Sequence, residues 1–245
     1  MTSRDRLLAA FHGELPDRLP WAPEFNIVFC ERILSEIPGE PYTEETKYIE
    51  ACRRMRAECF LRADAVEVEY PNVAVTDAQD GAVITHTYEM PMGTLTSRAR
   101  MIDEIGTEME FEHMVQTVED VRMYQFMYED ALYRPRYDFV GNQIAQMGES
   151  GVVSIFGPPT PLLDLIMFQI RLPTIYFLMQ DHPKEVTSLL EAMHRRNCEY
   201  YEVAAQAPGE VVRSFEDTST TLISPELYRD WCLSQLKDYR DICHA

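Results

Sequence analysis

Short apolar runs that alternate with segments of helical periodicity are the feature that most limits how this chain can fold. Four such runs are present, at residues 19–25, 65–70, 152–156 and 211–215. Each is followed by loop residues and then by apolar residues at the spacing of an amphipathic helix. Strands separated by helices form right-handed β-α-β units, which build a parallel sheet. The pattern therefore predicts an α/β fold with four parallel strands, either half of a (β/α)8 barrel or a complete open sheet.

The helical segments carry sequence signals for their first residues. Capping side chains, acids in the first turn and proline at the first helical position all mark a helix start. These signals predict a helix over residues 3–13 led by Ser3, and a second helix that begins at Thr43 with Glu44 and Glu45 and runs to about Leu61. A third helix is predicted after Thr117, with Asp120 in its first turn. Two more are predicted over residues 183–206, beginning at Pro183, and after Ser224-Pro225. Together with the apolar runs, these helices complete the alternation that the α/β fold requires.

One segment breaks the alternation of strands and helices. Residues 81–90 and 93–101 have strand-like alternation on both sides of Pro91-Met92. Two such runs joined by a short turn indicate an antiparallel hairpin. We therefore expect a hairpin inserted after the second parallel strand, with His86 on its surface.

The balance of charged residues excludes two classes of partner. The chain has 41 acidic and 22 basic residues and a net charge of −19. Nucleic-acid binding and adhesion to anionic lipid both require clustered Lys and Arg. No apolar run is long enough to span a membrane, and charges interrupt the N-terminal apolar segment where a signal peptide would be apolar. We therefore expect a cytoplasmic protein, with residues 1–245 in one domain and neither nucleic acid nor a membrane as a partner.

Polar residues follow the predicted strands, where a (β/α) barrel carries its catalytic and binding groups. Glu216 and Asp217 end the fourth run and are the candidate catalytic residues. The candidate substrate-binding residues are Glu24, Asn26, Glu69, Tyr70, Gly157 and Pro158. The tight turn at Gly157 leaves room for a ligand close to the backbone. Asp217 would equally cap a turn through neighbouring amides, and Glu24 and Glu69 would equally be solvated loop acids.

Several stretches together resemble the uroporphyrinogen decarboxylase superfamily of TIM barrels. The stretches are SRDRLLAAFHGELPDRLPW near the N-terminus, VEDVRMYQFM, GVVSIFGPPTPLLDLI, DHPKEVTSLLEAMH and the segment from Ser214 to Ala245. They cover nearly the whole chain apart from the hairpin. The resemblance implies that the chain is a fragment holding about the first half of a (β/α)8 TIM barrel. Since half a barrel exposes strand edges and its inner face, we expect the isolated fragment to self-associate, which sedimentation would measure.

The resemblance implies two reaction classes. Members that decarboxylate a tetrapyrrole have an arginine-containing segment after the first strand, whereas residues 21–33 contain no arginine before Arg32. Members that transfer methyl groups to or from corrinoids and thiols have a zinc site on later strands, where the metal makes a thiolate nucleophile. We therefore expect corrinoid-linked methyl transfer from a small-molecule or corrinoid-protein substrate. Asp217 would orient a ligand, and any zinc would be held outside this chain.

Two alternatives remain open. The first is a decarboxylase of the uroporphyrinogen type, although an acid-lined mouth would repel its polyanionic substrate. The second is a non-catalytic binding protein of the same fold.

Cys243-His244 is an adjacent pair of metal-ligating residue types, but a lone pair only weakly indicates a metal site.

Overall fold

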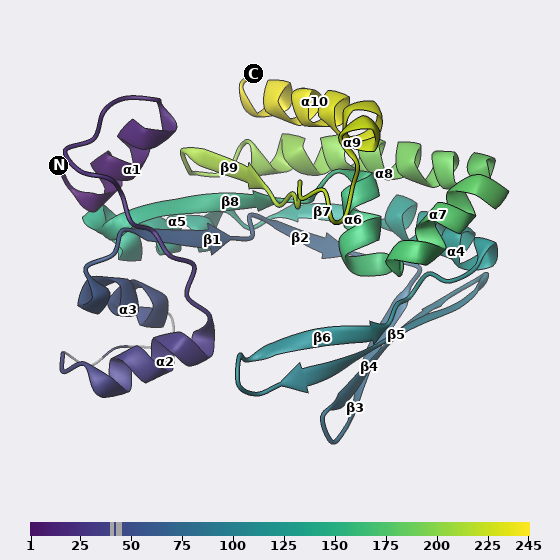
Figure 1. Cartoon of the computed structure of the whole chain (residues 1–245), viewed down its shortest axis with the longest axis horizontal. Coiled ribbons are helices and arrows are strands. Elements are labelled where there is room, and N and C mark those ends of the chain that lie inside the picture. Colours follow the sequence, from purple (N-terminus) through teal and green to yellow (C-terminus); the bar gives the residue numbers. More distant parts are fainter. Residues whose placement is uncertain (40–41, 43–45) are drawn as a thin grey trace.

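The centre of the computed structural model is a parallel sheet of three strands, drawn with the rest of the chain in Figure 1. The structure describes residues 1–39, 42 and 46–245. The strands are β1 (Cys59–Ala63), β8 (Gly151–Gly157) and β9 (Val211–Ser214), hydrogen-bonded in the order β1-β8-β9. The predicted strands at 152–156 and 211–215 are confirmed. The described strands form open sheets and no closed barrel, so the architecture is mixed α/β.

The first predicted strand, at residues 19–25, is wrong, because these residues form a loop beside β1. Within the described residues, a single backbone hydrogen bond joins the two segments, from the Glu58 amide to the Trp21 carbonyl oxygen at 2.9 Å. Pro20 and Pro23 have no amide hydrogen to donate. A regular ladder of hydrogen bonds therefore cannot form along this segment.

The second predicted strand exists, but it belongs to a different sheet. β2 (Val66–Glu69) pairs antiparallel with β7 (Leu132–Pro135) in a two-stranded sheet. Its predicted place in the parallel sheet is taken by β1, which lies at the end of the helix expected to reach Leu61. That expected helix is too long, because α3 (Lys47–Met55) ends at Arg56, whose left-handed backbone (φ 55°) stops it. The expected cap at residues 43–45 lies outside the described residues.

The predicted hairpin is confirmed as part of a larger antiparallel sheet. β4 (Val83–Met90) and β5 (Gly93–Ile102) pair across the predicted turn, while β3 (Ala74–Asp80) and β6 (Thr107–Glu112) extend the sheet on either side. Figure 1 shows this sheet as a layer separate from the parallel strands. His86 lies on it as an ion-pair bridge, with Nδ1 2.8 Å from Asp77 Oδ1 and Nε2 3.2 Å from Glu108 Oε2.

The two longest helices begin where the sequence predicts. α4 (Val118–Asp130) is capped by Thr117, whose hydroxyl accepts a hydrogen bond from the Asp120 amide while the Asp120 carboxylate accepts from the Thr117 amide. α8 (Pro183–Ala204) has Pro183 as its first residue. The predicted start of α8 is therefore confirmed, and its apolar residues Val186, Leu189, Leu190, Met193 and Ala204 are buried.

The terminal helices differ from the prediction in detail. α1 (Ser3–Phe11) is capped by Thr2 instead of being led by Ser3. The last helix begins with Ser224 as its cap, as predicted, but Cys232 divides it into α9 (Pro225–Trp231) and α10 (Leu233–Cys243). The remaining helical elements are α2 (Ile27–Glu36), α5 (Tyr137–Met147), α6 (Pro161–Asp164), α7 (Leu172–Asp181), a 3-10 turn (Gly148–Ser150) and a π-helical turn (Leu165–Gln169). In the described part of the chain, no helix combines the length and apolar character that crossing a membrane requires.

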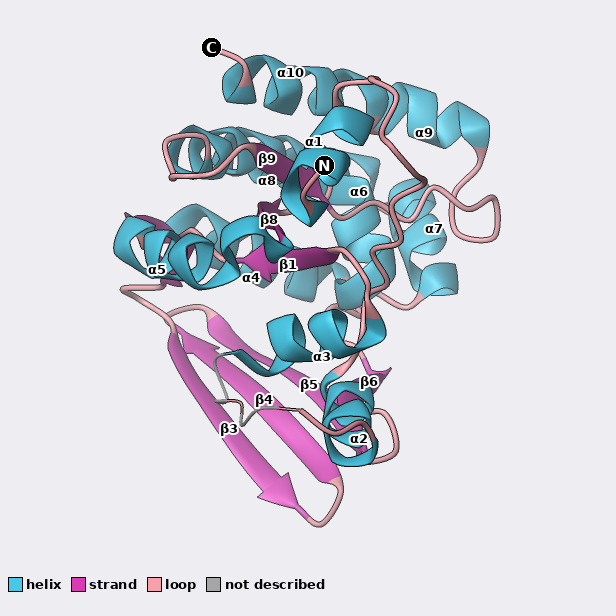
Figure 2. Cartoon of the chain, turned by 90° about the vertical axis from the view of Figure 1, so that its left-hand side faces the viewer, coloured by secondary structure: helices cyan, strands magenta, loops and turns pink. Residues whose placement is uncertain are grey.

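Alternation of side chains gives the parallel sheet two faces. One face packs against α5 and α8 in a buried cluster that includes Cys59, Ala63, Val153, Ile155, Val140, Met147 and Ala204. Figure 2 shows both helices on the same side of the three strands. We call the opposite side the inner face; it carries Phe60, Arg62, Val152, Ser154, Phe156, Val211 and Arg213. At its amino-terminal end it meets α1, since the Phe11 and Phe60 ring centroids are 5.4 Å apart.

A buried carboxylate joins the N-terminal segment to the parallel sheet. Glu58 is fully buried directly before β1, and it accepts hydrogen bonds from Arg6 Nη1 at 2.6 Å and from the Trp21 amide at 2.7 Å. Arg18 also forms an ion pair with this carboxylate. Arg6, in turn, donates from Nε to Asp17 Oδ1 at 2.6 Å. The charges therefore neutralise one another in a place from which water is largely excluded.

Replacing Glu58 by alanine should lower the free energy of unfolding by about 3–5 kcal/mol, because the buried Arg6 would lose one of its two carboxylate partners and the Trp21 amide would lose its acceptor. Urea unfolding at neutral pH measures this change. Glu36→Ala is the matched control, since Glu36 forms an exposed ion pair with Arg32 and should cost less than about 1 kcal/mol. Equal losses in the two variants would contradict the role given to Glu58.

Candidate functional site

Glu216 lies just beyond β9 and forms hydrogen bonds with the loop that follows β8. Its Oε1 accepts hydrogen bonds from the Thr160 amide at 2.7 Å and the Ser214 hydroxyl at 2.8 Å, and its Oε2 accepts from Thr160 Oγ1 at 3.0 Å. Burial raises the pKa of Glu216, although these donors act in the opposite direction. The carboxylate therefore holds the carboxyl ends of two neighbouring strands together.

Asp217 points into its own loop. Its Oδ1 accepts a hydrogen bond from the Ser219 amide at 2.8 Å, which is the geometry of an Asx turn. The turn-capping interpretation of Asp217 is therefore realised in the structure. The side chain is half-buried, and Oδ2 makes no hydrogen bond within the described residues, so one oxygen remains for a ligand.

A second buried carboxyl group lies near Glu216. Asp164, at the end of α6, is buried, and its Oδ2 accepts a hydrogen bond from the Tyr124 hydroxyl at 3.3 Å. Burial is the main cause that raises its pKa to about 7, and the charge of Glu216 adds to this effect. A carboxyl group with a pKa near neutrality can both donate and accept a proton at physiological pH.

Arg213 is the main cationic group on the inner face. Its guanidinium carbon lies 5.3 Å from the centroid of the Phe60 ring and 5.8 Å from that of Phe156. Its nearest carboxylate is on Glu24, 3.6 Å from Nη2 and 75% exposed. Arg213 Nε is buried and has no hydrogen-bond partner in the described part of the chain. The aromatic rings thus orient a guanidinium that retains free donors.

Arg62 extends this arrangement on β1, which is separated from the strand of Arg213 by β8. Its guanidinium carbon stacks 3.5 Å from the centroid of the Phe156 ring, and Asp64 accepts from its Nε at 3.1 Å and its Nη2 at 2.9 Å. Phe156 is also 6.1 Å from Phe215, which is exposed. The inner face therefore combines two arginine side chains with a row of aromatic rings, and such a surface suits a flat anion.

The predicted binding residues do not all meet at this face. Glu24 lies beside Arg213. Asn26 caps α2, with Oδ1 accepting from the Phe29 amide at 2.8 Å. Glu69 pairs with Arg134 across the β2–β7 ladder, at 2.5 Å from Nε. Asn26 and Glu69 therefore have structural partners of their own.

The remaining predicted residues lie on the helix-covered side of the sheet. At Gly157, an added Cβ would be only 2.4 Å from the Tyr201 ring. The space beside this glycine is therefore filled by the Tyr201 ring and is not open to a ligand. The Tyr201 hydroxyl donates to the Pro158 carbonyl oxygen at 2.8 Å. Tyr70 and Pro158 line one pocket together. The structure thus brings these two residues together, and the Ser214 hydroxyl, 3.1 Å from the Pro158 carbonyl oxygen, links Pro158 to Glu216.

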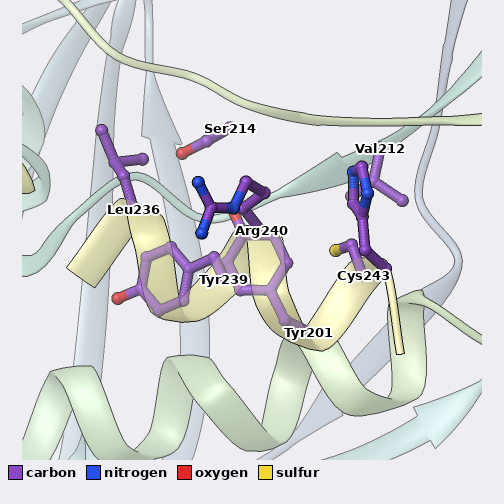
Figure 3. A pocket seen from close by; sticks show the side chains of 8 residues that line it. Tyr201, Val212, Ser214, Leu236, Tyr239, Arg240 and Cys243 are labelled. Atoms are coloured by element: carbon purple, nitrogen blue, oxygen red, sulfur yellow. The ribbon is translucent and has the colours of Figure 1, made fainter. Parts of the chain in front are cut away.

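Figure 3 shows another pocket, of about 200 Å³, between β9, α8 and α10. The rings of Tyr201 and Tyr239 stack there with centroids 4.4 Å apart. Cys243 and His244 line one end, and burial raises the pKa of the Cys243 thiol, which disfavours the thiolate that binds metals. Within the described residues, no group of three or more His, Cys, Asp and Glu side chains could hold a metal ion.

The sequence-based prediction missed Arg62, Arg213 and Asp164. Parallel strands buried on both faces have nearly continuous apolar sequences. An arginine inside such a run, as in residues 59–63 and 211–215, is therefore a usable signal for a site. Asp164 gives a similar signal as the one acid within the apolar segment 161–168.

Asp164 should make stability fall as the pH rises. In the unfolded chain its pKa is near 3.8, whereas in the folded chain it is about 7. Folding therefore favours the protonated form, and stability is lost between about pH 4 and pH 7. Asp164→Asn should remove this loss. Between pH 4 and pH 8, the free energy of unfolding of the variant should therefore rise by about 3–5 kcal/mol relative to that of the parent protein.

Urea unfolding of both proteins across this pH range measures the difference. The matched control is Asp181→Asn in the exposed last turn of α7, which should leave the pH dependence unchanged. Parallel pH profiles for the parent and Asp164→Asn proteins would show that Asp164 titrates normally.

Comparison with known proteins assigns no family. No family model matches the chain, and no curated protein matches its sequence. Function is therefore inferred from the arrangement of the side chains.

Proposed function

We propose that the inner face binds a flat small molecule carrying a carboxylate, in an enzyme of the uroporphyrinogen decarboxylase superfamily whose reaction is corrinoid-linked methyl transfer. The observation that carries the binding proposal is the position of Arg213. Its guanidinium lies against Phe60 and Phe156, and its buried Nε has no partner in the described residues. Because such a guanidinium binds a carboxylate through two parallel hydrogen bonds, it can fix both the position and the orientation of a ligand.

The barrel proposal is supported by the order of the parallel strands. β1, β8 and β9 lie in the sheet in the same order as in the chain. The connection from β8 to β9 is helical, and the connection from β1 to β8 contains α4 and α5 together with strands β2 to β7. Within the described residues, β9 pairs only with β8, so its other edge is open to a further strand. In a completed TIM barrel the inner face would line the interior, and the ends of these strands would form the mouth.

The roles proposed for the two acids at the end of β9 differ. Glu216 would hold the β8 and β9 loops in place through Thr160 and Ser214. Asp217 would use its free oxygen to orient a polar group of the substrate. The described residues do not fit a zinc site, so any zinc or corrinoid would be held by other residues or by a partner protein.

Decarboxylation is the second candidate reaction. Arg62 and Arg213 are separated by one strand on the same face, so a substrate with several carboxylates would meet more than one cation. This pair offsets the argument that acids at the mouth would repel a polyanion, because the local charge next to the ligand outweighs distant charges that solvent screens.

Binding of 2-naphthoate tests the proposed ligand class. Its ring would lie on the phenylalanine side chains and its carboxylate on Arg213, whereas 2-naphthamide has the same shape without the charge. Fluorescence titration of the purified protein should show tighter binding of the acid. Arg213→Met should weaken it by about tenfold or more, since hydrogen bonds to charged groups contribute about 1.5–3 kcal/mol.

Arg229→Met, on the exposed surface of α9, is the control that should leave 2-naphthoate binding unchanged. Equal affinity for the acid and the amide, or no effect of Arg213→Met, would contradict the binding proposal. Methyl transfer from methylcob(III)alamin to a thiol would support the first reaction. Release of carbon dioxide from uroporphyrinogen would support the second.

Asp217→Asn tests the role of the free carboxylate oxygen. The asparagine Oδ1 can still accept from the Ser219 amide, so the turn should survive and the thermal melt should change little. We expect slower turnover in whichever of the two reactions the protein performs. Asp230→Asn, at an exposed position of α9, is the control, and equal turnover in the two variants would remove Asp217 from the site.

A further inference from the structure

We propose that a separate pocket, on the helix-covered side of the sheet, binds a neutral molecule with a single aromatic ring and one hydrogen-bonding group. The pocket lies between α8, the β2–β7 sheet, the end of α4 and the loop after β8. Its lining residues are Val68, Tyr70, Tyr128, Ala131, Tyr133, Pro158, Asn197 and Tyr200. It is distinct from the inner face, because none of these side chains belongs to that face.

The size of the pocket limits the ligand. Its volume is about 110 Å³. An apolar cavity of about 150 Å³ in another protein holds benzene, so this space suits a molecule of about one ring. A two-ring compound such as 2-naphthoate would not fit without displacement of the walls.

The composition of the walls determines the chemistry of the ligand. Four tyrosine rings and the side chains of Val68, Ala131 and Pro158 form the lining, and no charged side chain is among them. Aromatic walls favour an aromatic ligand through offset and edge-to-face contacts. A charged ligand would lose its hydration without gaining a counter-ion, so the ligand should be neutral.

Three of the four tyrosine hydroxyls in the lining have a polar partner, which for the Tyr133 hydroxyl is the Arg196 side chain. The Tyr128 hydroxyl donates to Asn197 Oδ1 at 2.7 Å, and the Tyr200 hydroxyl donates to the Phe156 carbonyl oxygen at 3.2 Å. The Tyr70 hydroxyl makes no hydrogen bond within the described residues. Burial raises the pKa of Tyr70 to about 12, so this hydroxyl is protonated and able to donate to a ligand oxygen or nitrogen.

The walls of the pocket are held in place from behind. Asn197 is fully buried, and its Nδ2 donates to the Pro159 carbonyl oxygen at 3.0 Å. The rings of Tyr133 and Tyr200 meet edge to face with centroids 5.4 Å apart, and the Arg196 guanidinium carbon lies 4.9 Å from the centroid of the Tyr133 ring. A pocket that is already formed binds a small ligand without the cost of ordering its side chains.

Phenol is the probe that tests this site, and toluene is the matched ligand without a hydroxyl. Isothermal titration of the purified protein should show a Kd for phenol on the order of 1 mM or tighter, which is within the range that seven heavy atoms can provide. Tyr70→Phe should weaken phenol binding about fivefold, the effect of one neutral hydrogen bond. It should leave toluene binding unchanged.

Val68→Trp should fill the pocket and abolish the binding of both ligands. Val75→Trp on β3 is the control, because Val68 and Val75 are exposed by 37% and 48%, and Val75 is outside the pocket. Arg213→Met should leave phenol binding intact, which separates this proposal from the one for the inner face. No phenol binding by the parent protein, or equal binding by Val68→Trp and Val75→Trp, would overturn it.

Discussion

The path of the N-terminal segment depends on the burial of one carboxylate. Glu58 has no contact with solvent, and Arg6, Arg18 and the Trp21 amide all donate to it. A buried ion needs partners at every polar atom, since its desolvation costs several kcal/mol. Because the Trp21 amide bonds to a side chain, it is not available for a strand ladder. The interaction that attaches this segment to β1 therefore also prevents it from becoming a regular strand.

A second carboxylate has the same function at the opposite end of the parallel strands. Glu216 binds the amide and the hydroxyl of Thr160, so it connects β9 to the loop after β8. Asp164 lies in the same buried region, where burial and, to a smaller extent, the charge of Glu216 raise its pKa to about 7. The ends of β8 and β9 are thus connected by hydrogen bonds, and Asp164 in α6 can exchange a proton near neutrality.

The sequence predicts the parts of the fold whose signals are local. Thr117 and Pro183 mark helix starts by backbone chemistry that acts within one turn, and the apolar runs at 152–156 and 211–215 are long enough to identify as buried strands. β1 follows α3 without a glycine or proline between them, so residues 59–63 resemble a continuation of the helix. The direction of β2 depends on β7, more than 60 residues away, and no local pattern specifies such a partner. The site shows a different limit, because a polar residue after a strand can bind a ligand or cap a local turn or helix. Asp217 and Asn26 both accept hydrogen bonds from backbone amides close in sequence.

The net charge of the chain does not by itself predict the charge of the ligands that it can bind. The excess of acids over bases is a property of the whole surface, and salt screens it within about 8–10 Å. On the inner face, the nearest groups to a ligand would be the guanidinium groups of Arg62 and Arg213, both fixed against Phe156. Across the sheet, the tyrosine-lined pocket presents no charge at all. The sheet thus separates a surface suited to an anion from a pocket suited to a neutral ring, because the pocket is lined by residues of α8, the end of α4, the β2–β7 sheet and the loop after β8, and by no side chain of the inner face.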